Sequence, residues 1–71
     1  MDKKEIREKI EHLEKLFGSL EVIAVKMGVS VYSIARWKQG KNVPHKSFQK
    51  KLKKLYLSTM AGMAKKMEVK K

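Results

Sequence analysis

The chain has 71 residues, no cysteine and a formal net charge of +11. This length predicts a single domain with a narrow apolar core, and the absence of cysteine excludes disulfides and cysteine-ligated metal sites from it. A strongly basic small protein is typical of binding to a polyanion, of which nucleic acid is the usual example.

The first predicted helix runs from about residue 3 to residue 17. Asp2 and Glu5 have the spacing of a capping box, in which the aspartate caps the helix and the glutamate reaches back. Apolar residues then recur at helical spacing, at Ile6, Ile10, Leu13 and Phe17. Gly18 is expected to end the helix and Ser19 to cap the next one. We interpret this helix as scaffold, with His12 on its polar side and without a chemical role.

The most informative stretch is residues 20–39. A short helix that ends at Gly28 is predicted by the spacing of Leu20, Ile23, Ala24 and Met27. Ser30 can cap a second helix, in which Val31, Ile34 and Trp37 repeat the periodic signal and which ends at Gly40. Two short helices joined by a three-residue turn that contains glycine form the helix-turn-helix pattern.

This stretch resembles the helix-turn-helix of the Cro/lambda-repressor-like (XRE-type) family. The resemblance covers residues 6–56 as a layout and is carried by Ala24, Gly28, Val29, Ser30, Ile34, Trp37, Gly40 and Pro44. It implies an all-α fold, a compact four- to five-helix lambda-repressor-like DNA-binding domain whose second motif helix enters the major groove. Many relatives carry glutamine where this chain has Leu20, so the phosphate contact of that glutamine is not expected here.

The second motif helix, residues 31–39, is predicted to read DNA bases with the side chains on its outer side: Val31, Tyr32, Ala35 and Arg36. A guanidinium such as that of Arg36 can donate two hydrogen bonds to guanine, and Val31 can contact a thymine methyl group. Three alternatives stay open: Arg36 binds only phosphate, Tyr32 packs on its own helix, or Val31 is partly buried. Because few of these residues are polar, the sequence preference is expected to be modest or to depend on DNA shape.

Contacts with DNA phosphates are expected from hydroxyl, amide and lysine side chains around the motif: Ser19, Ser30, Ser33, Gln39, Lys41, Asn42 and Lys46. In the proteins that this chain resembles, the loop after the recognition helix (residues 40–44 here) runs along the sugar-phosphate backbone. A solvated turn without contacts is the alternative for this loop.

The C-terminal part is strongly basic. Residues 45–71 carry nine basic and one acidic side chain, whereas residues 1–19 carry five of each. A helix is predicted from about His45, with its apolar side at Phe48, Leu52, Leu55 and Tyr56. The DNA-binding domain is expected to cover residues 1–57, and residues 58–71 to form a C-terminal helix or tail. The methionines in this tail are adaptable side chains that suit a homodimer contact through residues 57–67 or a cover for the core. A frayed basic end is the third alternative.

Together these features predict a DNA-binding transcriptional regulator, most simply a small repressor that acts on double-stranded DNA in the cytoplasm, associated with the nucleoid. A weakly sequence-specific architectural or accessory DNA-binding protein and an antitoxin-like protein-interaction module remain alternatives. An enzyme is not expected, because Asp2 is the sole aspartate and no glycine-rich phosphate loop is present. We also expect no cofactor, metal ion, small-molecule substrate or membrane partner, since the longest apolar run covers only residues 22–25.

Overall fold

The computed structural model describes the backbone of residues 2–69 and the side chains of residues 2–62. The described chain folds into four α-helices and no strand: α1 (Lys3–Phe17), α2 (Leu20–Met27), α3 (Val31–Gln39) and α4 (Lys46–Val69). The predicted all-α class is confirmed, and the number of helices lies at the lower end of the expected range.

The helix boundaries follow the capping residues that the sequence predicts. The Asp2 carboxylate accepts a hydrogen bond from the Glu5 backbone N–H at 2.8 Å, and Ser19 caps α2. Gly28 and Gly40, which end α2 and α3, have left-handed φ angles of 71° and 77°. Glycine reaches this region without the steric cost that other residues incur, so each helix stops where its glycine stands.

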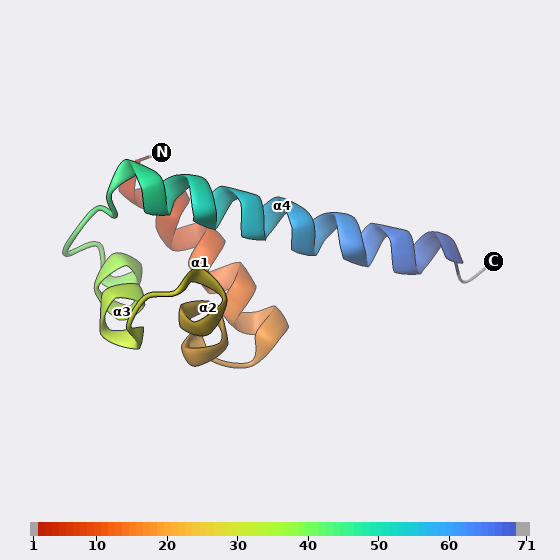
Figure 1. Ribbon diagram of the computed structural model, residues 1–71, viewed down its shortest axis with the longest axis horizontal. Helices are drawn as coiled ribbons and strands as arrows, with labels where there is room; N and C mark the ends of the chain where they lie inside the picture. The colour runs from red at the N-terminus through yellow and green to blue at the C-terminus, as the bar shows by residue number, and fades with distance from the viewer. Residues whose placement is uncertain (1, 70–71) are drawn as a thin grey trace.

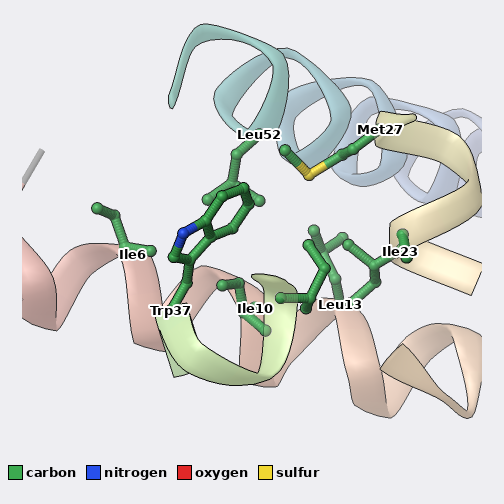
Figure 2. Packing of buried hydrophobic residues seen from close by; sticks show 9 residues of the cluster. Ile6, Ile10, Leu13, Ile23, Met27, Trp37 and Leu52 are labelled. Carbon is green, nitrogen blue, oxygen red and sulfur yellow. The ribbon is translucent and has the colours of Figure 1, made fainter. Parts of the chain in front are cut away.

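The core consists of nine buried apolar side chains from all four helices: Ile6, Ile10, Leu13, Ile23, Ala24, Met27, Ile34, Trp37 and Leu52. Figure 2 shows side chains of this set pointing toward one another from α1, α2, α3 and α4. Full burial of one such side chain stabilises the fold by about 1.5–3 kcal/mol. Trp37 is one of the buried residues, which confirms the prediction that it belongs to the core. The centres of its ring and of the Phe48 ring lie 5.9 Å apart.

The helices are arranged around α1 and α2. Both α3 and α4 pack against this pair, whereas α3 and α4 meet chiefly where Trp37 lies beside Phe48. Because α3 is covered by α1 and α2 on one side only, its opposite side faces solvent (Figure 1). The fold thus presents the second motif helix at the surface.

One helix, α4, continues without a break from Lys46 to Val69 and passes the position expected to separate domain from tail. Its apolar side contacts the core through Phe48, Leu52, Leu55 and Tyr56, as predicted. The C-terminal part of α4 extends beyond the other three helices, so the molecule measures 43 × 21 × 19 Å (Figure 1). Although α4 has 24 residues, neither it nor another helix within residues 2–69 is apolar and long enough to cross a membrane.

His12 has a structural role that the sequence did not indicate. Its Nδ1 atom and the Tyr56 hydroxyl share a hydrogen bond of 3.0 Å, which joins α1 to α4. The Lys9 ammonium lies 5.0 Å above the centre of the same tyrosine ring, a cation–π contact. His12 is exposed, as expected, but it helps to hold the two helices together.

Candidate nucleic-acid interface

The turn between α2 and α3 has the three residues that the sequence predicts, Gly28, Val29 and Ser30. The backbone N–H of Val29 donates to the Ala24 carbonyl at 3.0 Å, which closes the end of α2. The Ser30 hydroxyl then accepts the Ser33 backbone N–H at 3.2 Å and starts α3. Since α2 ends and α3 begins within these three residues, α3 is positioned by local hydrogen bonds as well as by the core.

The solvent-facing side of α3 carries a stripe of three long side chains, Tyr32, Arg36 and Gln39. Tyr32 is 78% exposed, and Arg36 and Gln39 are also exposed. Their spacing of four and three residues places them one above the other on a helix. Ile34 and Trp37, on the opposite side, are buried. A phenol, a guanidinium and a carboxamide are thereby presented together, and all three can donate hydrogen bonds.

Val31 and Ala35, the other two residues expected to read bases, are only partly exposed. Val31 packs against the core because it stands three residues before Ile34 and therefore shares its inward side. The structure differs here from the prediction that Val31 lies on the outer side. Of the alternatives left open, partial burial of Val31 is the one observed.

The three serines expected to contact phosphates all take part in helix capping. Ser19 accepts the Val22 backbone N–H at 3.4 Å, and Ser30 accepts that of Ser33. The hydroxyls of Ser30 and Ser33 lie 3.2 Å apart, so one hydroxyl hydrogen is shared between them. A hydroxyl can accept and donate at the same time, so the second hydrogen of this pair stays available for an acceptor outside the protein.

The loop after α3 presents Lys41 and Asn42 to solvent, and the exposed Lys46 begins α4 beside it. The Lys41 backbone N–H donates to the Arg36 carbonyl at 3.0 Å, which fixes the direction in which the loop leaves α3. At the other end, Pro44 is buried and its carbonyl accepts the Gln49 side-chain amide at 2.8 Å. The four polar residues expected on the outer surface around this loop are thus all exposed: Gln39, Lys41, Asn42 and Lys46.

Lys38 belongs to α3 but not to its exposed stripe. Its ammonium lies 2.5 Å from a carboxylate oxygen of Glu14 in α1, and this is the one ion pair among residues 2–62. The side chains are 32% and 33% exposed. The positive charge of Lys38 is therefore balanced within the protein.

Sequence reasoning missed the contribution of α1 to this region. A hollow of about 360 Å³ is lined by Lys3, Lys4 and Arg7 of α1 together with Gln39 and Gly40 at the end of α3. The signal available in the sequence was the spacing of Lys3 and Arg7, which places both on one side of the helix. Because glutamates alternate with these cations along the chain, the sequence instead indicates a neutral helix that serves as scaffold.

A second basic hollow, of about 300 Å³, lies between α2 and α4, where Lys26, Lys51 and Lys54 surround Met27 and Leu55. No residue of α3 or of the loop after it lines this hollow. Within the described part of the chain, no group of three histidine, aspartate or glutamate side chains could hold a metal ion. Comparison with family models, with curated proteins and with solved structures finds no match to the chain.

Proposed function

We propose that the chain is a DNA-binding transcriptional regulator with a lambda-repressor-like domain, and that α3 enters the major groove of double-stranded DNA. The observation that carries this proposal is the exposed stripe of Tyr32, Arg36 and Gln39 on a helix that the turn and the core hold in place. A net charge of +11 supports an anionic partner.

The dimensions of α3 suit a groove. An α-helix with its side chains is about 10–12 Å across, and the major groove is about 12 Å wide and admits one helix. In this position Arg36 donates two hydrogen bonds to the O6 and N7 atoms of a guanine. Tyr32 reaches the bases or a phosphate near the N-terminal end of α3, and the partly exposed Ala35 allows the close approach of a base edge.

Phosphates on the two sides of the groove are bound by the residues around α3. Lys41, Asn42 and Lys46 contact the backbone near the C-terminal end of α3, and Gln39 adds a donor there. Ser30 and Ser33 supply a hydroxyl at the N-terminal end. These contacts position the protein, whereas the stripe on α3 carries the sequence preference.

Repression follows from occlusion, since a protein bound in the major groove blocks access of polymerase to the same site. We propose that two copies bind a two-fold symmetric site, with half-sites about one helical turn apart. The support is that α4 extends beyond the other helices (Figure 1) and that it carries an apolar side chain, Leu57, which is 55% exposed. The side chains of Met63, Ala64 and Met67, which belong to the expected contact through residues 57–67, lie outside those that the structure describes. Such a regulator acts in the cytoplasm, on the nucleoid.

An architectural DNA-binding protein is the second candidate, because lysine outnumbers arginine sixteen to two. Lysine ammonium groups are hydrated point charges that suit phosphates better than base edges. Both candidates bind DNA less tightly as the salt concentration rises, so a salt titration does not separate them.

Selection of duplexes from a random pool, followed by affinity measurements on the recovered and on a random sequence, tests the proposal. A regulator gives a common, palindromic site bound at least about 10³-fold more tightly than random DNA. A ratio near one supports the architectural candidate instead. Absence of binding to duplex DNA at low salt contradicts both.

A further inference from the structure

The hollow between the start of α1 and the end of α3 has the composition of an anion site. Three of its five lining residues are the cations Lys3, Lys4 and Arg7, and the other two are Gln39 and Gly40. No carboxylate lines it. The side chains of Lys3, Lys4, Arg7 and Gln39 are exposed, so a ligand can reach them without any movement of the core.

The three cations of the hollow form no ion pair with the carboxylates of α1 among residues 2–62. Asp2 lies close to these cations in sequence, but its carboxylate accepts the Glu5 backbone N–H and caps the helix. Glu14 of α1 is paired with Lys38 of α3. The Lys38–Glu14 pair is the one ion pair within residues 2–62, so Lys3, Lys4 and Arg7 are not paired with a carboxylate and can bind an external anion.

The position of this hollow connects it to the proposed DNA-binding side. Gln39 belongs to the exposed stripe of α3, and Gly40 begins the loop that carries Lys41 and Asn42. The hollow therefore lies at the C-terminal end of α3, about 13 Å along the helix from the cap at Ser30. Residues distant in sequence, from the start of α1 and the end of α3, meet at this point.

We infer that this hollow, which we call the α1–α3 cradle, binds a phosphodiester group of the DNA backbone and adds a second segment of the chain to the interface. The inference rests on the proposed function. The guanidinium of Arg7 can hold two phosphate oxygens at once, and Lys3 and Lys4 add two point charges. With Gln39 in its lining and Lys41 directly after Gly40 in the chain, the cradle binds the DNA backbone that flanks the C-terminal end of α3.

The hollow between α2 and α4 provides a matched comparison. It is also lined by three lysines, Lys26, Lys51 and Lys54, but it contains the apolar side chains of Met27 and Leu55. It is built from α2 and α4 alone, without a residue of α3 or of the loop that follows it, so we expect DNA bound along α3 not to contact it. Removing three charges there changes the net charge as much as removing three charges from the cradle.

The experiment compares two triple variants of the full chain on a fluorescein-labelled duplex, by fluorescence anisotropy over a range of salt concentrations. One variant changes the cradle (Lys3→Gln, Lys4→Gln and Arg7→Gln), and the control changes the other hollow (Lys26→Gln, Lys51→Gln and Lys54→Gln). Each phosphate contact contributes about 0.9 to the slope of log affinity against log salt. We expect the cradle variant to lose at least about 0.9 of this slope and about tenfold more affinity than the control.

Equal losses of affinity and of slope in the two variants would overturn the cradle while leaving the proposed function intact. Absence of binding by the unchanged chain would overturn both. Thermal unfolding followed by circular dichroism verifies that each variant is folded. If a triple variant is unfolded, Arg7→Gln and Lys51→Gln carry the same comparison, with loss of slope expected for Arg7→Gln only.

Discussion

Lys38 of α3 and Glu14 of α1 form an ion pair across the interface between the two helices, with 2.5 Å between the nitrogen and the oxygen. The pair stands on the side of α3 that faces the protein, next to the buried Ile34 and Trp37. It therefore ties the helix that carries Tyr32 and Arg36 to the scaffold. It also means that the charge of Lys38 is balanced within the protein.

The energy of this pair is expected to be small. Both side chains are about one-third exposed, and ion pairs of this kind contribute up to about 1 kcal/mol. A double-mutant cycle with Glu14→Gln and Lys38→Gln, measured by urea unfolding and the fluorescence of Trp37, should give a coupling in this range that decreases at high salt. A coupling above about 2 kcal/mol that persists at high salt would show that the pair is shielded from water.

Gly28 and Gly62 are predicted to respond in opposite directions to replacement by alanine. An added Cβ meets nothing within 4 Å at either position, so the backbone conformation alone decides the effect. Gly28 has a left-handed φ, and Gly28→Ala should lower the free energy of unfolding by about 1–2 kcal/mol. Gly62 lies inside α4, where alanine is the better helix former, so Gly62→Ala should raise it by up to about 1 kcal/mol. Urea unfolding of the two variants tests this, and a stabilised Gly28→Ala would contradict the turn.

Two leucines of α4 offer a matched test of the core. Leu52 is fully buried, and Leu52→Ala should cost about 2–5 kcal/mol of unfolding free energy. Leu57 is 55% exposed, and Leu57→Ala should change the free energy of unfolding of the monomer by no more than about 0.5 kcal/mol. Chemical unfolding at two protein concentrations measures both effects. A loss at Leu57 that grows as the protein is concentrated would support a dimer through the projecting part of α4.

Arg36 and Lys41 are predicted to affect DNA binding in different ways. Arg36→Ala should lower affinity for the selected site by about 1–3 kcal/mol more than for random DNA, since it removes a contact with a base edge. Lys41→Ala should weaken binding to both sequences alike and reduce the salt slope by about one unit. Anisotropy measurements on the two duplexes compare them. Equal loss on both sequences for Arg36→Ala would assign it to a phosphate.

The features that could be predicted from the sequence depend on residues close together in the chain. The caps at Asp2 and Ser30 and the turn at Gly28 act over two to four residues, and the buried side chains recur at helical spacing. Each of these features therefore corresponds to a pattern that can be recognised in a single sequence. The all-α fold and the burial of Trp37 follow from such patterns.

The features that could not be predicted join residues far apart in the chain. Glu14 and Lys38 are 24 positions apart, and His12 and Tyr56 are 44 positions apart. Polar residues on helix surfaces have no period that identifies their partners, so these contacts depend on how the helices pack. For the same reason, the sequence does not indicate that Lys3 and Arg7 line one hollow together with Gln39.

Nuclear magnetic resonance tests whether α3 and its flanking residues bind DNA, as we propose. The backbone amide signals of the full chain are followed as duplex DNA is added at low salt. We expect the largest shifts in residues 30–42, with further shifts at the start of α1. Shifts concentrated around Lys26, Lys51 and Lys54, or no shifts at all, would contradict the proposal.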